Sequence, residues 1–164
     1  MNIKYFETLN SSFLAHYARR LADLIIEQGS KLLKDLDISV PTTSISTILY
    51  ISKNGAPSVA TLAEELGVTH QMASQRINLL EKMLMVERAN HPTDKRAKIV
   101  RLTKLGVSEA EKLIPFTKQM DKVFDELETE VGCQLTQVIR QTELSLLNRP
   151  LYERINKKSI RNEK

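Results

Sequence analysis

Three amide side chains recur between residues 71 and 78 at a spacing that places them on one face of a helix. Gln71, Gln75 and Asn78 are four and three residues apart, and side chains at this spacing project from the same side of an α-helix. An amide group both donates and accepts hydrogen bonds, so Gln or Asn can pair with N6 and N7 of adenine in the major groove. Ser74 flanks this row and supplies a hydroxyl, which makes looser contacts. The spacing therefore indicates a surface suited to the base edges of duplex DNA.

The segments on either side of this row predict the elements that would hold it in place. Apolar residues at helical spacing predict a helix over residues 59–66, which Gly67 ends, and Thr69 can cap the helix that follows. In this second helix the predicted buried stripe lies opposite the amides and consists of Ala73, Ile77, Leu80 and Leu84. Two helices joined by so short a turn form a helix-turn-helix.

Two short apolar runs follow the second helix and predict a β-hairpin. Residues 85–89 and 98–102 alternate between apolar and polar side chains, with one break at Ile99. The tip between them carries Lys95 and Arg96, and the negative potential of a minor groove attracts such side chains. A helix-turn-helix followed by a hairpin is the order of a winged helix-turn-helix.

Basic residues gather around the predicted wing. The stretch of residues 82–104 holds seven lysines and arginines against two acidic residues, whereas the whole chain has a formal net charge of only +4. Such a cluster raises the affinity for phosphate and makes binding salt-dependent. A solvated charged face is the alternative interpretation, and the neighbouring wing favours DNA. The low aromatic content of 5%, without tryptophan, argues against stacking platforms for single strands.

Short motifs in this region resemble one known family. They are LAEELG at residues 62–67, LLEKM at 79–83 followed by MVER at 85–88, DKRA at 94–97 and LTKLG at 102–106. In these motifs, and over nearly its whole length, the chain is similar to the MarR (multiple antibiotic resistance regulator) family of bacterial winged-helix proteins.

The resemblance implies a homodimer that binds a pseudo-palindromic operator in double-stranded DNA, acts as a repressor and responds to a small aromatic effector. In the wing, it implies that Arg96 reaches DNA while Asp94 helps to hold the hairpin. The family usually has glycine where Leu84 stands, and often has Thr-Arg at the positions of Ser74 and Gln75. A different operator is therefore implied.

The predicted DNA-binding residues fall into groups by role. Gln71, Ser74 and Gln75 are expected to read bases, and Thr69 and Arg76 to contact phosphates or groove edges. The complete set is Thr69, His70, Gln71, Ser74, Gln75, Arg76, Asn78, Lys95, Arg96 and Lys98. No ligand-binding residue is assigned, and neither a metal nor a cofactor is expected.

The predicted fold is mainly α with a small β-wing (α+β), in one MarR-like domain over residues 1–164. The winged helix-turn-helix occupies residues 42–103, and apolar stripes predict helices within 11–34 and 104–148. Residues 149–164 form a basic tail, for which a solvated end is preferred and DNA contact is the alternative. A head of about sixty residues is too small to bury these stripes alone. The two helical segments are therefore predicted to dimerise with a second copy. The alternative is a monomer whose arms fold onto its own head.

The sequence gives no support to catalytic chemistry. His16, His70 and His91 are far apart, and the chain has neither a paired-cysteine motif nor a phosphate-binding glycine loop. An enzyme is not expected. Two further functions stay open. One is a winged-helix protein-interaction module without specific DNA binding, and the other is a regulator switched by oxidation of Cys133. For Cys133 a buried or bystander thiol is preferred over a redox-active one. A cytoplasmic location is expected, because there is no membrane span or secretory leader.

Overall fold

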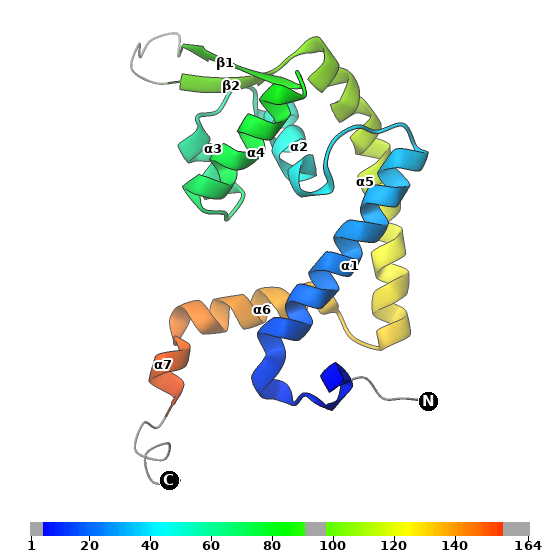
Figure 1. Ribbon diagram of the computed structural model, residues 1–164, viewed down its shortest axis with the longest axis vertical. Coiled ribbons are helices and arrows are strands. Elements are labelled where there is room, and N and C mark those ends of the chain that lie inside the picture. The colour runs from blue at the N-terminus through cyan, green and yellow to red at the C-terminus, as the bar shows by residue number, and fades with distance from the viewer. Residues whose placement is uncertain (1–4, 91–97, 156–164) are drawn as a thin grey trace. The chain divides into compact units, whose positions relative to one another are not determined.

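The computed structural model of the chain describes residues 5–90 and 98–155. Most of these residues are helical, and one two-stranded antiparallel sheet completes the fold (Figure 1). The chain divides into two compact units, residues 1–116 and 117–164. The predicted mainly α fold with a small β-wing is confirmed.

The first unit contains the predicted head and the first long helix. Its elements are η1 (Tyr5–Thr8), η2 (Ser11–Phe13), α1 (Leu14–Asp35), η3 (Thr42–Ser44), α2 (Ile45–Asn54), α3 (Val59–Glu65), α4 (His70–Lys82), β1 (Val86–Asn90), β2 (Lys98–Leu102) and the start of α5 (Lys104–Val131). The second unit contains the rest of α5, α6 (Leu135–Asn148) and α7 (Leu151–Arg154). The short helix α7 lies in the segment that was predicted to be a solvated tail.

The two helices of the helix-turn-helix begin at hydroxyl caps. The Ser58 side chain accepts a hydrogen bond from the backbone N–H of Thr61 at 3.0 Å, and the Thr69 side chain accepts one from Met72 at 3.2 Å. Each cap satisfies a backbone N–H that the first helical turn leaves without a partner. The predicted cap at Thr69 is confirmed.

Four helices end in the same hydrogen-bond pattern. In each, one residue takes a left-handed backbone conformation just beyond the helix, and the next N–H bonds back to a carbonyl five residues earlier, which is the Schellman motif. The left-handed residues of α1, α3, α4 and α5 are Asp37, Gly67, Leu84 and Gly132, with φ of 52°, 60°, 59° and 72°. Glycine adopts this conformation without steric cost, and the leucine at the end of α4 is therefore unexpected.

The hydrophobic core of the first unit lies under the helix-turn-helix. It is built from the end of α1, the segment after it, the helices α2 to α4, the wing strands and the first turns of α5. Its members are Leu33, Ile38, Val40, Ile48, Ile51, Leu62, Ile77, Leu80, Met85, Val86, Val100, Ala110 and Leu113. Leu84 was predicted to continue the buried stripe of α4, and this prediction is wrong. The helix ends at Lys82, and the Leu84 side chain is 71% exposed.

The wing is anchored at its base. Strands β1 and β2 pair with Val86 opposite Leu102 and Asn90 opposite Lys98. The backbone N–H of Val100 donates to the carbonyl of Pro57 at 2.9 Å, and Ser58 forms a bridge with Ile99. Ile99 and Val100 are both buried, which explains the break in alternation that the sequence contains. The wing strands therefore start from a fixed position beside the beginning of α3.

Candidate nucleic-acid interface

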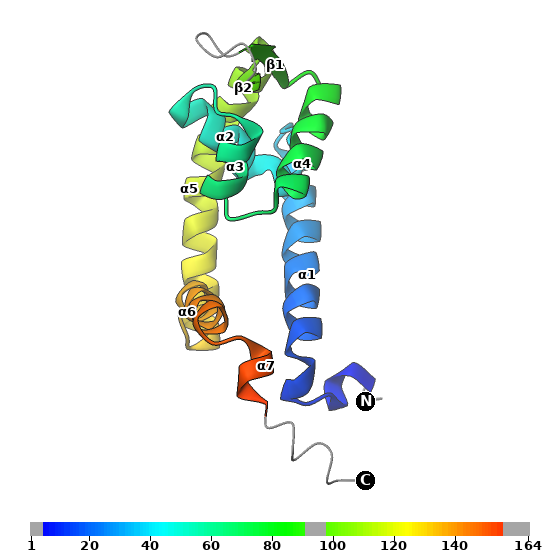
Figure 2. The ribbon, with the colours of Figure 1, turned by 90° about the vertical axis from the view of Figure 1, so that its left-hand side faces the viewer.

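Helix α4 presents its amide row outward. Gln71, Gln75 and Asn78 are exposed, whereas the opposite face of α4 is buried in the core. Helix α3 packs beside α4 in the head (Figure 2). Burial of the apolar stripe sets the orientation of the helix about its axis. The predicted outward orientation of the three amides is confirmed.

The remaining candidates on α4 differ in exposure. Thr69 and His70 are exposed at the start of the helix, while Ser74 and Arg76 are half-buried. The Thr69 hydroxyl oxygen accepts the bond from the Met72 N–H with one of its lone pairs, and the hydroxyl proton can still be donated to a phosphate. These residues surround the amide row and give the start of α4 a polar surface.

Asn78 is tied to the first wing strand. Arg88, on β1, donates through Nη2 to the Asn78 side-chain oxygen at 2.7 Å, and its Nη1 forms an ion pair with the Glu81 carboxylate. The amide of Asn78 is thus already engaged within the protein. The roles of Arg88 and Glu81 could not be predicted from the sequence, because a contact between a helix and a later strand leaves no periodic signal.

The tip of the wing lies outside the described residues. Asp94, Lys95 and Arg96 belong to this segment, as does His91, and their predicted roles stay predictions. Lys98 is described, and its ammonium group donates to the side-chain oxygen of Asn90, its partner across the hairpin. Lys98 remains exposed at the point where the second strand leaves the tip.

Part of the basic cluster is neutralised within the fold. Arg88 pairs with Glu81, and Arg101 pairs with Glu87 at 2.7 Å. Lys82, Lys98 and Lys104 are exposed and pair with no carboxylate in the part of the chain that the structure describes. The positive charge available to a phosphate backbone is therefore smaller than the sequence count indicates.

A buried carboxylate joins α5 to the segment that follows α1. Glu109 is only 2% exposed, and its Oε2 accepts a hydrogen bond from the backbone N–H of Ser39 at 2.6 Å. Lys112 donates to the other carboxylate oxygen at 2.7 Å and to the carbonyl of Asp37 at 2.8 Å. The spacing of Glu109 four residues before Leu113 is the signal that could have placed it on the buried face.

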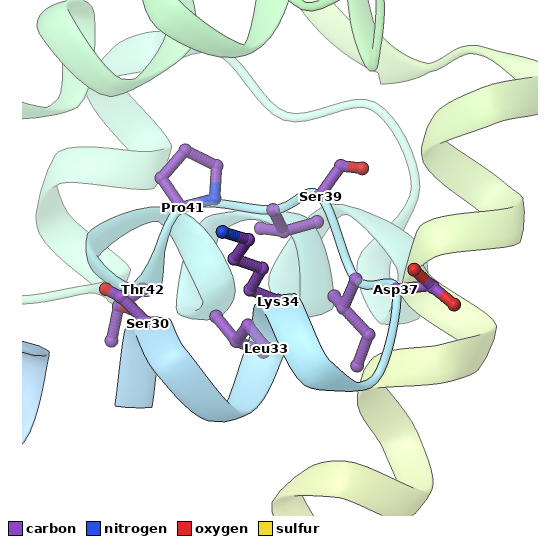
Figure 3. Close-up of a pocket in the computed structure, with 9 residues that line it drawn as sticks. Ser30, Leu33, Lys34, Asp37, Ser39, Pro41 and Thr42 are labelled. Atoms are coloured by element: carbon purple, nitrogen blue, oxygen red, sulfur yellow. The ribbon is translucent and has the colours of Figure 1, made fainter. Parts of the chain in front are cut away.

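A pocket of about 380 Å³ lies between the last turns of α1 and the segment that leads to α2. Its lining is mixed, with Leu33, Ile38, Val40 and Pro41 beside Ser30, Lys34, Asp37, Ser39 and Thr42. Figure 3 shows Ser30 and Thr42 side by side at one end and Asp37 at the other. The hydroxyls of Ser30 and Thr42 are 2.7 Å apart and bonded to each other.

Each unit also carries an exposed apolar face. On α1 the side chains of Leu14, Leu21, Leu24, Ile25 and Leu32 are exposed, and Leu24 is 50% accessible. In the second unit the exposed apolar residues include Val123, Val131, Val138, Ile139, Leu144, Leu146 and Leu147. Single exposed apolar residues are ordinary, but a helix-length stripe of them marks an interaction surface.

The only cysteine of the sequence, Cys133, is exposed beside Gly132, where Asp125 and Glu128 line the same shallow pocket. The prediction of a buried or bystander thiol is therefore wrong in its first alternative, because the thiol is exposed. The acidic surroundings also differ from the positive ones that activate cysteines. Across residues 5–90 and 98–155, no three His, Cys, Asp or Glu side chains are placed to share a metal ion, and none of the helices could span a membrane.

Comparison with known proteins gives a family match in the head. Residues 38–97 match the MarR family. This stretch contains α2 to α4 and the first wing strand. No curated protein matches the sequence.

Several solved structures share the fold. The heme sensor protein PefR from Streptococcus agalactiae in complex with heme is 19% identical with a TM-score of 0.55, and the match covers 85% of this chain and 95% of that one. The adhesin competence repressor AdcR from Streptococcus pyogenes is 18% identical with a TM-score of 0.51, over 82% of this chain and 97% of that one. A mutant of ZitR from Lactococcus lactis is 16% identical with a TM-score of 0.51, over 78% and 95%.

Proposed function

We propose that this chain, whose residues 38–97 match the MarR family, is a homodimeric, sequence-specific DNA-binding transcriptional regulator and acts as a ligand-responsive repressor. Such a role needs no catalytic chemistry. A regulator of this kind acts in the cytoplasm, where the bacterial chromosome lies.

One observation carries the proposal, namely the exposed amide row on α4 beside a wing that carries the exposed Lys98. Gln71 and Gln75 are exposed on the outer face of the helix, where each can meet a base edge in the major groove. The wing strands are anchored beside α3, so the wing and the amide row belong to one head. A helix for the major groove and a basic hairpin for the adjoining groove are the two contacts that a winged helix makes.

A homodimer would present two such heads to one operator. A two-fold axis presents two heads to successive turns of DNA, and a pseudo-palindromic operator with half-sites about 10 bp apart would match it. The exposed apolar stripe of α1 and the exposed apolar residues of α5 and α6 support a second copy of the chain as the partner. Burying these side chains supplies the free energy of association.

An effector would act by shifting the dimer between two spacings of its heads. A ligand releases DNA only when it binds more tightly to the dimer whose heads do not fit the operator. PefR is described as a heme sensor and AdcR as a repressor, and these descriptions support a regulator that responds to a small molecule. For this chain we propose a small aromatic or phenolic effector, and no residue is assigned to bind it.

Selection of bound sites from random duplexes tests the function directly. The purified protein is expected to enrich two inverted half-sites at a constant spacing, and candidate phenolic ligands added afterwards are expected to release the selected duplex. Failure to enrich any sequence in dilute salt would contradict the proposal. A salt-insensitive, duplex-independent association with another protein would instead favour the protein-interaction module.

The redox alternative has a separate test. Peroxide treatment followed by mass spectrometry would reveal a disulfide between the Cys133 residues of two chains. Under the present proposal the variant Cys133→Ser keeps the operator affinity of the unchanged protein, and loss of binding through such a disulfide would favour the redox switch.

A further inference from the structure

Arg88 holds the amide of Asn78 in one orientation. We infer that Asn78 thereby favours guanine, whose major-groove edge has two hydrogen-bond acceptors, over adenine, whose edge has one acceptor and one donor. The inference rests on the proposed function, since it concerns the α4 face that is proposed to enter the major groove. It assigns Arg88 a positioning role in base selection, although Arg88 itself is on the wing strand β1.

The orientation of the amide follows from the donors of arginine. A guanidinium group has five N–H donors and no acceptor, so the Asn78 atom that lies 2.7 Å from Arg88 Nη2 must be the oxygen. The same guanidinium pairs with the Glu81 carboxylate through Nη1. Two partners on a planar fork determine its position more strictly than one partner would.

Glu81 and Asn78 are suited to act as a pair. They are three residues apart on α4, a spacing at which side chains are neighbours on the helix surface. Arg88 stands opposite Val100 in the hairpin, and Val100 is fully buried in the core. The strand that carries the guanidinium is therefore held in place by the core, and the guanidinium links this strand to the helix.

The consequence for recognition is chemical. Adenine pairs bidentately with an amide that accepts from N6 and donates to N7. Arg88 occupies one of the two lone pairs of the Asn78 oxygen and places a cationic donor 2.7 Å from it, which disfavours a second donor such as adenine N6, whereas the amide nitrogen keeps its N–H donors. Guanine presents two acceptors, N7 and O6, on the same edge. Asn78 in the intact protein is therefore expected to favour guanine at its operator position, and to favour adenine only after its oxygen is released.

The experiment compares the sites selected from random duplexes by four full-length variants. Asn78→Ala identifies the operator position that Asn78 reads, because the preference there is lost while the other positions keep theirs. Arg88→Met removes the guanidinium and retains an apolar stem, so the Asn78 oxygen becomes free. The double variant Asn78→Ala with Arg88→Met tests whether any new preference comes from Asn78. Arg101→Met is the matched control, since it removes an ion-paired arginine of the same wing that bonds Glu87 instead of α4.

In the Arg88→Met variant, preference at the Asn78 position is expected to change from guanine to adenine by about fivefold or more. The change should disappear in the double variant and be absent from Arg101→Met. Unchanged selection by Arg88→Met would overturn the inference, as would a uniform loss of affinity in Asn78→Ala, which would indicate a phosphate contact. If the unchanged protein selects no sequence at all, the proposed function itself fails. Circular dichroism melting of each variant verifies that the fold is retained.

Discussion

At the scale of single residues, the end of α4 carries a local strain. Leu84 occupies the left-handed position of a Schellman motif, in which its N–H bonds to the Glu81 carbonyl at 3.0 Å and the next N–H bonds to Leu80 at 2.9 Å. A side chain with a Cβ loses roughly 1–2 kcal/mol in this conformation. The exposed leucine side chain buries little surface that would offset the loss.

Replacement of Leu84 by glycine is therefore expected to stabilise the protein. Leu84→Gly should raise the free energy of unfolding by about 1 kcal/mol, measured by urea denaturation at constant protein concentration. Leu84→Ala is the control, because it shortens the side chain and keeps the Cβ. Equal stability of the glycine and alanine variants would show that the backbone conformation at this position carries no strain.

Loss of an exposed amide on α4 is expected to affect specificity more than affinity. Gln75→Ala should chiefly relax the preference at one operator position, because Gln75 is exposed on this helix and its amide is proposed to contact a base edge. Sites selected from random duplexes by the variant and the unchanged protein give the comparison. A loss of affinity that is equal for all sequences would assign Gln75 to the phosphate backbone instead.

Loss of the wing arginine is expected to affect affinity more than specificity. Arg96→Ala should weaken binding to all sequences and reduce the slope of log affinity against log salt by about one, as expected for a lost phosphate contact. Binding measured at several salt concentrations tests this. An unchanged affinity and salt slope would make the wing assignment wrong.

Which side chains point outward was predictable from the sequence, and which of them are engaged was not. The helical period alone decides that Gln71, Gln75 and Asn78 face away from the core. The same period, continued past the end of the helix, placed Leu84 in the core, because no glycine marked the stop. The bonds of Asn78 to Arg88 and of Glu109 to Ser39 join residues from different elements, so no local pattern announces them.

At the scale of elements, the junction of the wing and α5 is closely packed. The N–H of Thr103 donates to the Met85 carbonyl at 3.0 Å, and the Thr103 hydroxyl donates to the carbonyl of Leu84 and accepts from the N–H of Gly106. A Cβ added at Gly106 would lie 2.0 Å from the Met85 carbonyl oxygen. The backbone of α5 therefore approaches the residue before the first wing strand more closely than any residue with a side chain allows.

Substitution of this glycine is expected to destabilise the head although it lies in a helix. Gly106→Ala should lower the free energy of unfolding by about 3 kcal/mol, the upper range for overpacking, since backbone atoms must move. Gly29→Ala in α1 provides the comparison. Its added Cβ would meet only the side chain of Thr42, at 3.4 Å or more, and alanine favours a helix by about 1 kcal/mol. Thermal melting of both variants measures the difference, and similar effects of the two substitutions would contradict the close approach.

The elements were predictable to the extent that their signals are local. The cap at Thr69, the stop at Gly67 and the apolar spacing predicted the two helices of the helix-turn-helix and the two wing strands to within a few residues, and the first wing strand begins one residue later than predicted. The short helix α7 was not predicted, because four residues after Pro150 carry too little periodicity. The close contact at Gly106 was also invisible, since it depends on how a strand and a helix meet.

At the scale of the whole molecule, the apolar stripe of α1 stays exposed within its own unit. Leu14, Leu24 and Leu32 recur along 22 residues of helix on the surface, whereas the end of the same helix contributes Leu33 to the core. The stripe was predictable from its period. The spacing of the two heads in the proposed dimer was not predictable, because that distance depends on how a second copy packs.

A charge placed in the stripe is expected to separate the proposed dimer. Ile25→Glu introduces a carboxylate into the apolar face of α1, where burial in a dimer would cost more than association supplies. Sedimentation should then give a single chain where the unchanged protein gives a dimer, and operator affinity should fall by about a hundredfold because one head must bind alone. Arg19→Glu serves as the control, as Arg19 lies on the opposite, polar face and pairs with Asp23. A dimer that persists in Ile25→Glu would exclude the α1 stripe as the interface, and a monomeric unchanged protein would exclude the dimer altogether.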